Sequence, residues 1–274
     1  MAERSLPGSA GDARLRGRIP TGAPAPRFGA LIIGDEILSG KRQDRHFAKA
    51  IEILGRRGLT LSWSMYLPDE PDMIAEVLTS TMGRPDVVFS FGGIGATPDD
   101  HTRQCAAKAA GVALALHPDA KREIEARFGA EAYPKRIEMG VFPVGSRIIP
   151  NPYNRVPGFS YRRHHFLPGF PEMAWPMMEW VLDNEYREFH RATPPVDVAI
   201  IVKDAGESQL IDLMNGCIAR FPDVKLFSLP SFTPAGRRIE LGVKGEARLA
   251  NEALDYLKQG VTKLGFGWEE RGEV

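Results

Sequence analysis

The segment best suited to binding a ligand is Phe-Gly-Gly-Ile-Gly-Ala-Thr-Pro-Asp-Asp-His-Thr at 91–102, between an apolar run and a helical pattern. Glycines allow a tight turn with bare N–H groups, and the N-terminus of the following helix favours an anion. Pro98 takes the third glycine position of the dinucleotide fingerprint, and no Gly-Lys-Ser/Thr of a P-loop follows. The pattern predicts a phosphate cradle. The alternative is a plain turn in which Asp100 caps the helix.

Acidic residues follow three predicted strands. Asp99 and Asp100 would repel a phosphate unless a divalent cation bridges them, or unless they bind a neutral hydroxyl or ring N–H. Asp35 follows the first strand and Asp69 follows the second. Taken singly, either is typical of a helix-capping carboxylate. Loops at the carboxyl ends of parallel strands share one edge of the sheet, so we expect the three acidic loops to converge on a pocket.

Other candidates have weaker patterns. Arg103 and Arg155 could offer an anion a bidentate partner, although a solvated arginine is the commoner case. His164 and His165 are adjacent on a predicted strand, so they point to opposite faces and are interpreted as structural. The Met and Trp cluster at 175–180 has helical spacing and is interpreted as core or as a dimer contact.

The elements that position these residues follow an α/β pattern. Residues 28–91 read as strand, helix, strand, helix and strand, and helices at 102–110, 118–128 and 171–190 flank a strand within 162–169. Tandem prolines at 194–195 mark a boundary. Beyond them, strands at 196–203, 223–232 and 237–245 and helices at 207–221 and 246–265 predict a small βαββα unit. We therefore predict a flexible tail at 1–27, an α/β domain at 28–193 and an α+β domain at 196–270.

Composition limits the classes of protein to consider. Of 274 residues, 43% are hydrophobic and 26% charged, which excludes disordered, collagenous and coiled-coil classes. Lys plus Arg and Asp plus Glu are 35 each, so a nucleic-acid partner is not expected without a local basic patch. Cys105 and Cys217 read as reduced, buried thiols. Neither a membrane span nor a signal peptide is apparent, so a cytoplasmic location is expected.

Five motifs occur in an order that resembles a known family. They are GDEILSG (34–40), LPDE (67–70), FGGIGATPDDHTR (91–103), NPYNRVPGF (151–159) and LPGFPEM (167–173). Together they resemble the molybdopterin-binding domain of the MoaB/Mog-like molybdenum-cofactor biosynthesis proteins, and most of all the N-terminal part of competence/damage-inducible protein A. The resemblance covers about residues 28–190.

The resemblance implies a three-layer α/β/α domain that binds molybdopterin or a related pterin or nucleotide through its phosphate. It implies functional roles for Asp69 and Asp100, with Asp35 as the acid of the first loop. The implied ligand-facing turns are the phosphate loop and the turn before the last helix, with the residues Gly92, Gly93, Gly95, Thr97, Pro168, Gly169 and Pro171. It also implies a dimer or trimer.

The chain departs from the competence proteins in three places. Those proteins usually continue into a C-terminal amidohydrolase domain, so without that domain we expect no deamidase activity. The first loop reads GKRQDRH (40–46) where an asparagine-bearing segment is more common, and Met139 stands where a polar amide is common. These departures weaken an assignment as a hydrolase more than one as a binding protein.

Three functions remain open. The first is binding of molybdopterin or a related phosphate-bearing pterin or nucleotide. The second is hydrolysis of an ADP-ribose-like pyrophosphate with Mg²⁺ or a similar ion on Asp35, Asp69 and Asp100, an activity that the resemblance also implies. The third is a non-catalytic regulatory or assembly module, whose small unit carries no aromatic-rich strand of the kind that binds RNA.

Overall fold

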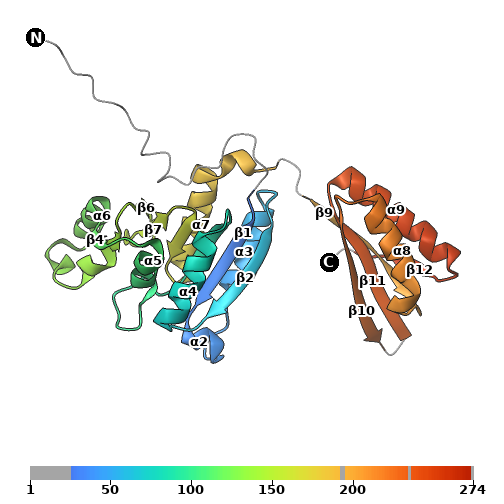
Figure 1. The fold of residues 1–274 in the computed structure, drawn as a ribbon, viewed down its shortest axis with the longest axis horizontal. Helices are drawn as coiled ribbons and strands as arrows, with labels where there is room; N and C mark the ends of the chain where they lie inside the picture. The colour runs from blue at the N-terminus through green and yellow to red at the C-terminus, as the bar shows by residue number, and fades with distance from the viewer. Residues whose placement is uncertain (1–25, 192–194, 234–235, 273–274) are drawn as a thin grey trace, which may run out of the picture. The chain divides into compact units, whose positions relative to one another are not determined.

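The computed structural model describes residues 26–191, 195–233 and 236–272. The predicted tail, apart from Pro26 and Arg27, lies outside the described residues. The chain divides into two compact units, Met1–Arg191 and Ala192–Val274, each with its own sheet (Figure 1). None of the described helices is both long and apolar enough to cross a membrane.

The first unit is a three-layer α/β/α domain built on a six-stranded mixed sheet (Figure 1). The strand order is β2-β1-β3-β8-β7-β6, and the first four strands run parallel. Strand β7 pairs with β8 in the antiparallel direction, and β6 pairs with β7 in the same way. The strands are β1 (Phe28–Ile33), β2 (Leu61–Leu67), β3 (Val87–Phe91), β6 (Arg147–Ile149), β7 (Gly158–Tyr161) and β8 (His164–Leu167). The chain runs from β1 outward to β2 and then crosses to β3, so β1 and β3 flank the point where the strand order reverses.

Helices cover both faces of this sheet. One core joins α3 (His46–Gly55) and α7 (Pro171–Glu185) to the face that carries Phe28 and Phe89. The other joins α4 (Pro71–Met82) and α5 (Thr102–Ala110) to the face that carries Leu31 and Phe166. The alternation of β1 residues between the two cores is the period of two that a central strand requires. Strand β1 is buried along its whole length, which explains its continuous apolar sequence.

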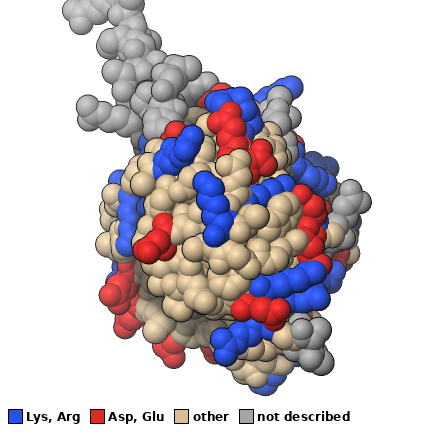
Figure 2. Space-filling model, turned by 90° about the vertical axis from the view of Figure 1, so that its right-hand side faces the viewer, with Lys and Arg blue, Asp and Glu red and all other residues tan. Residues whose placement is uncertain are grey.

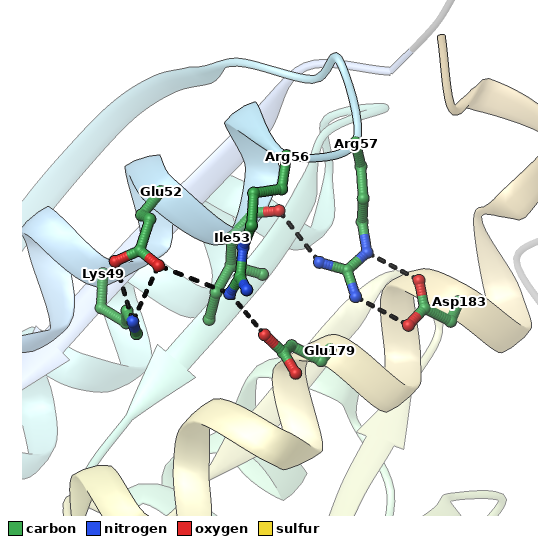
Figure 3. A network of polar contacts seen from close by, with 7 residues as sticks. All are labelled: Lys49, Glu52, Ile53, Arg56, Arg57, Glu179 and Asp183. Carbon is green, nitrogen blue, oxygen red and sulfur yellow. Dashed lines mark hydrogen bonds and ion pairs between the residues drawn. The ribbon is translucent and has the colours of Figure 1, made fainter. Parts of the chain in front are cut away.

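Ion pairs join α3 to α7 across their solvent side (Figure 3). The Arg57 guanidinium donates Nε and Nη2 to the two carboxylate oxygens of Asp183 at 2.6 and 2.7 Å, and Nη1 to the Ile53 carbonyl at 3.0 Å. Arg56 donates to Glu179 at 2.7 Å. Two parallel hydrogen bonds fix the relative orientation of the groups as well as their separation. The network therefore holds the first and last helices of one layer in register.

Several short elements of this unit are not predicted from the sequence. Between the helix at 118–128 and the strand within 162–169 the sequence predicts no element, yet this stretch contains strands β5 (Val141–Pro143), β6 and β7, and β5 pairs with β4 (Leu114–Leu116). The helix α6 (Pro118–Phe128) is followed by two 3₁₀ turns, η1 (Gly129–Ala132) and η2 (Arg136–Gly140), and α7 by a third, η3 (Arg187–Phe189). A four-residue helix, α2 (Asp35–Leu38), follows β1. The predicted helices at 102–110 and 118–128 have the expected bounds.

The second unit is a four-stranded antiparallel sheet with order β10-β11-β9-β12. Its elements are β9 (Val196–Lys203), α8 (Glu207–Arg220), β10 (Lys225–Thr233), β11 (Gly236–Gly245), α9 (Ala247–Lys263) and β12 (Trp268–Glu270). Both helices pack on one face, around a core that includes Ile200, Leu241 and Leu257. Strand β12 is an addition to the predicted βαββα order.

On the face of the molecule seen in Figure 2, basic side chains alternate with acidic ones around a largely uncharged centre. This mixture agrees with the balanced overall charge. A nucleic-acid partner requires a concentrated basic surface, and this face does not offer one among the described residues.

Candidate functional site

A cavity of about 500 Å³ opens at the carboxyl ends of the parallel strands. Its walls come from the loops after β1, β2, β3 and β8, together with residues of 128–139 and 151–157. This is the position at which open α/β sheets bind ligands, because the loops diverge on either side of the point where strand order reverses. The volume falls within the usual range for a small-molecule site. Eight of the ten predicted site residues line it, and Asp35 and Pro171 do not: the eight are Asp69, Gly92, Gly93, Gly95, Thr97, Asp100, Pro168 and Gly169.

The glycine loop forms the floor of this cavity. Gly92 and Gly93 have φ of 104° and 68°, and a Cβ on Gly93 would collide with the Thr102 hydroxyl. The Thr102 hydroxyl in turn donates to the Gly92 carbonyl at 3.1 Å, and the Thr102 backbone N–H donates to the Gly93 carbonyl at 3.0 Å. The loop is thus pressed against the start of α5, so side chains larger than hydrogen do not fit there.

Four consecutive backbone N–H groups of this loop, at residues 93–96, donate to no acceptor in the described part of the chain. All four residues line the cavity, just before α5 begins. Successive N–H groups without internal partners at the N-terminal side of a helix form a concave anion site. The loop therefore offers the N–H groups that a phosphate cradle requires, and binding of a phosphate there stays a prediction.

Asp100 holds the outer end of the loop. Its Oδ2 accepts the backbone N–H of Thr97 at 2.8 Å and the Thr97 hydroxyl at 2.6 Å, while its own N–H donates to the Thr97 carbonyl at 3.0 Å. The helix begins at Thr102 with His101 as its N-cap. The alternative in which Asp100 caps the helix is therefore wrong, because the carboxylate is engaged in closing the turn over Pro98.

Asp35 and Asp69 join two of the acidic loops. Asp69 Oδ2 accepts the Asp35 N–H at 2.9 Å, and Asp35 Oδ1 accepts the Asp69 N–H at 3.3 Å. Burial raises the pKa of Asp69, and the nearby charges of Asp35, Glu36 and Asp99 raise it further, against the effect of the Asp35 N–H. The three acidic loops converge as the sequence predicts. Glu36 and Asp99 also line the cavity, whereas Asp35 is exposed and does not line it.

The structure does not assemble a metal site from these acids. In the part of the chain that it describes, no three His, Cys, Asp or Glu side chains are grouped so that they could hold a metal ion. Asp35 is occupied by the Asp69 N–H and Asp100 by Thr97. The predicted set of Asp35, Asp69 and Asp100 therefore does not fit a resident divalent cation.

The opposite wall of the cavity is largely apolar. It consists of side chains from α7 and the turn before it, from α6 and η2, and from the loop before β7: Phe128, Met139, Asn151, Asn154, Val156, Pro157, Phe170 and Met173. Asn151 donates to Asn154 Oδ1 at 2.8 Å, and Asn154 donates to the Met173 sulfur at 3.3 Å. A thioether is a weak acceptor, so Asn154 retains donor capacity toward a ligand. The motifs NPYNRVPGF and LPGFPEM predict the two loops of this wall, the one before β7 and the one before α7. No motif predicts the contribution of α6.

Two residues that support or line the pocket are missed by sequence reasoning. Arg42 lines the cavity and makes no hydrogen bond or ion pair through its side chain with any described residue. His46 donates Nε2–H to the Gly169 carbonyl at 3.1 Å beneath the turn before α7. Both lie in the GKRQDRH segment, whose departure from the family pattern is the only signal that could have drawn attention to them.

The two arginines considered as anion ligands have other roles. Arg103 is buried and donates to the carbonyls of Gly95, Glu138 and Val141, so its guanidinium is used inside the protein. Arg155 pairs with Glu123 at 2.8 Å and does not line the cavity. The sequence does not predict these structural roles, because Glu138 and Val141, which bind Arg103, and Glu123, which binds Arg155, lie more than 30 residues away.

The remaining predictions about individual side chains are confirmed. His164 hydrogen-bonds with Thr81 on one face of β8, and His165 bonds with Ser160 and Tyr186 on the other. Both histidines are fully buried, and burial lowers the pKa of His164 to about 3, so they are neutral structural groups. Cys105 and Cys217 are buried free thiols. Trp175 and Trp180 pack against the core under α7.

Comparison with known proteins gives consistent results. Residues 29–188 match the family model described as a probable molybdopterin binding domain. A CinA-like protein of Citrifermentans bemidjiense is 31% identical over 256 residues, covering 90% of this chain and 61% of that protein. A protein of Pyrobaculum arsenaticum is 27% identical over 85% of this chain and 91% of its own length. The chain thus spans about three fifths of the Citrifermentans protein and most of the Pyrobaculum one.

A solved structure shares the fold of the first unit. The crystal structure of CinA from Thermoplasma acidophilum, a protein described as having unknown function, matches with a TM-score of 0.54 and 27% identity. The match covers 58% of this chain and 98% of that one.

Proposed function

Because the chain belongs to the probable molybdopterin binding domain family, we propose that its cavity binds molybdopterin or a related phosphate-bearing pterin or nucleotide. The observation that carries the proposal is the run of four N–H groups at 93–96 without acceptors in the described part of the chain. A phosphate placed there gains several charge-assisted hydrogen bonds and the favourable end of the α5 dipole.

The apolar wall suits the ring of such a ligand. Phe170, with 56% of its surface exposed, offers a ring face at the rim, and Met139 and Met173 offer polarisable surface further in. The free donor capacity of Asn154 suits a ring carbonyl or nitrogen. The cavity therefore combines an anion site at one wall with an aromatic site at the other.

The charges of the cavity select among anions. Among the described residues, four carboxylates line it (Glu36, Asp69, Asp99 and Asp100), and Arg42 is the one cation that does. These acids repel phosphate groups, so a ligand with one phosphate, held on the N–H groups of residues 93–96, is favoured over a ligand with several. Ring N–H and hydroxyl groups are the natural partners of these carboxylates.

The acids also favour a second candidate, hydrolysis of an ADP-ribose-like pyrophosphate. Asp69, whose pKa is raised by burial and by three neighbouring acids, has the environment expected of a general acid or base. Asp100 would lie at the other side of the bound phosphate. This activity would require a metal ion, and no three His, Cys, Asp or Glu side chains among the described residues are grouped to hold one. An assay for hydrolysis therefore tests this second candidate directly.

Calorimetric titration with matched pairs of probes tests the binding proposal. Neopterin phosphate is compared with neopterin, and AMP with adenosine. We expect binding that requires the phosphate in at least one pair. Equal binding of both members, or of neither, would contradict the proposal.

Incubation with ADP-ribose, with and without MgCl₂, tests the second candidate. Release of AMP that is lost in Asp69→Asn would establish hydrolysis. Intact ADP-ribose in all conditions would exclude this activity, and the binding proposal would stand on the titration alone.

We further propose that the protein acts in the cytoplasm as a homo-oligomer, a dimer or a trimer. Light scattering after size exclusion measures the mass directly, and a monomer at micromolar concentration would contradict this. The same sample, mixed with a labelled oligonucleotide, tests the expected absence of nucleic-acid binding.

A further inference from the structure

His46, the first residue of α3, is buried beneath the cavity with 6% of its surface exposed. Asp44 places it there, because the Asp44 carboxylate accepts the N–H groups of His46 at 2.7 Å and Phe47 at 3.1 Å and so begins the helix. The imidazole Nε2 lies 3.1 Å from the Gly169 carbonyl oxygen. A carbonyl can only accept, so Nε2 carries the proton and Nδ1 is the unprotonated nitrogen.

The faces of the ring contact both segments that lead into the ligand-facing loops. His46 stacks on Phe91, the last residue of β3, with ring centroids 4.6 Å apart and planes at 20°. Phe91 is followed directly by Gly92 of the glycine loop. On another side the edge of His46 meets Trp175 of α7, with centroids 6.5 Å apart and planes at 82°. One side chain therefore touches the supports of the glycine loop and of the turn before α7.

That turn also lies directly on the glycine loop. Gly92 donates its N–H to the Leu167 carbonyl at 3.0 Å, and a Cβ on Gly169 would lie 3.5 Å from the Gly92 Cα. A shift of Gly169 would consequently change the separation of the two walls of the cavity. The Phe170 side chain, which forms the exposed part of the apolar wall, follows Gly169 in sequence.

We infer that His46 is a positioning residue for the ligand: its Nε2–H bond to Gly169 fixes the turn at 168–170, and hence Phe170, at the distance from the glycine loop that ligand binding requires. The inference deepens the proposed function and rests on it for the statement about ligand, whereas the statement about the turn stands by itself. The bond spans 123 residues of sequence, and it is made by a residue of the segment that departs from the family pattern.

The environment of the ring keeps this bond in one protonation state. Nδ1 is buried and has no hydrogen-bond partner. Burial lowers the pKa of His46 despite the Gly169 carbonyl and the carboxylates of Asp44 and Glu172, and Arg45 lowers it further. The other charged group nearby, Lys49, lies over the Trp175 ring. Protonation would keep the Nε2–H bond but would place a charged Nδ1–H at a buried position without an acceptor, so it destabilises the packing of the ring beneath the turn.

Two variants separate the hydrogen bond from the packing. His46→Phe keeps a ring against Phe91 but has no donor for Gly169. His46→Gln restores a donor near the position of Nε2 and cannot be protonated near neutral pH. His190→Phe is the matched control, because His190 Nε2 also bonds a carbonyl, that of Leu182 at 3.1 Å, and does not line the cavity.

The first measurement is the dissociation constant for AMP and neopterin phosphate in each variant that remains folded by circular dichroism. We expect His46→Phe to bind about tenfold more weakly, as the loss of one buried hydrogen bond predicts, with His46→Gln and His190→Phe near wild type. At the low pH at which the buried imidazole becomes protonated, the wild type should lose affinity relative to His46→Gln, whose side chain does not titrate. Wild-type affinity in a folded His46→Phe would overturn the inference.

The second measurement is amide hydrogen exchange of residues 167–172 without ligand, which does not depend on the proposed function. Faster exchange there in His46→Phe than in His46→Gln is expected, and equal exchange in the two variants would overturn the statement about the turn. If the wild type binds neither probe but this exchange differs, the proposed function fails and the role of His46 in positioning the turn is retained. If His46→Phe does not fold, His46→Gln is compared with the wild type instead, in the amide exchange of residues 167–172 and in the pH dependence of the dissociation constant. A pH dependence that is the same in both proteins would then overturn the inference.

Discussion

Arg103 donates its Nη2 to the carbonyl of Gly95 at 2.6 Å, from inside the protein to the middle of the glycine loop. The same guanidinium donates Nη1 to the carbonyls of Glu138 and Val141, so one side chain joins the loop after β3 to the segment that carries Met139. A cation beneath the loop also adds positive potential on the side where an anion would bind. Arg103 thus supports the glycine loop without lining the cavity.

Replacing Arg103 should damage both stability and ligand binding. Arg103→Met leaves three carbonyls without the donor that they share, and a cost of about 2–4 kcal/mol in the free energy of unfolding follows from the number of bonds lost. Arg103→Lys should be intermediate, because one ammonium cannot reproduce the planar fork. Urea unfolding measures the effect. Arg155→Met, which removes an exposed pair with Glu123, is the control, and an equal loss in both variants would contradict the assigned role.

Gly93 should not tolerate a side chain. Gly93→Ala combines a φ of 68° with a collision against the Thr102 hydroxyl, so we expect a loss of about 1–3 kcal/mol and much weaker binding of phosphate-bearing probes. Gly111→Ala is a matched control, since Gly111 also has a φ of 68° but a Cβ there meets nothing within 4 Å. Thermal unfolding and calorimetric titration of the two variants separate backbone strain from crowding. Equal behaviour of the two would show that the close contact with Thr102 has no consequence.

The long elements of the fold are predictable from the sequence for a simple reason. Helices such as α5 and α6 carry apolar residues at helical spacing and a proline or glycine at their ends. The strands β5, β6 and β7 are only three or four residues long and lie among prolines and glycines, so no periodicity can develop in them. The pairing of β5 with β4 joins segments on either side of α6, which a local pattern does not contain, whereas β7 pairs with the adjacent β8.

The candidate site also has parts that the sequence predicts and parts that it does not. The glycine loop and the acidic loops are predictable, because each follows a recognisable strand and the strands are parallel. The roles of His46 and Arg103 are not, because they depend on where a side chain points and on acceptors that are 123 and up to 38 residues away. The capping role expected of Asp100 fails for a local reason, since Thr97 offers its carboxylate two donors within one turn.

Asp69→Asn should leave the fold intact and raise its stability slightly at neutral pH. The folded state raises the pKa of Asp69, so the folded state binds a proton that the unfolded state has already released. Stability is therefore lost as pH rises from about 4 through the folded pKa, and asparagine avoids this loss while its Oδ1 can still accept the Asp35 N–H. Allowing for solvent screening, the rise in Tm at pH 7 should be under about 2 °C, and it should vanish below pH 4. A clear fall in Tm at pH 7 would mean that the charge of Asp69 stabilises its loop.

The link between α3 and α7 gives a prediction of the opposite sign for Asp183 (Figure 3). The Arg57 hydrogen bonds lower the pKa of Asp183, so its contribution is present above the unfolded pKa of about 4 and is lost as pH falls through the lower folded value. Asp183→Asn should cost about 0.5–1 kcal/mol at pH 7, since Asp183 is half exposed, and the difference from wild type should shrink below pH 4. Urea unfolding at pH 7, 5 and 3.5 measures this, with Glu252→Gln as the control because its exposed pair with Arg248 stays within α9. A difference between Asp183→Asn and wild type that does not change with pH would show that packing between the helices, and not the charge of Asp183, holds α7 in place.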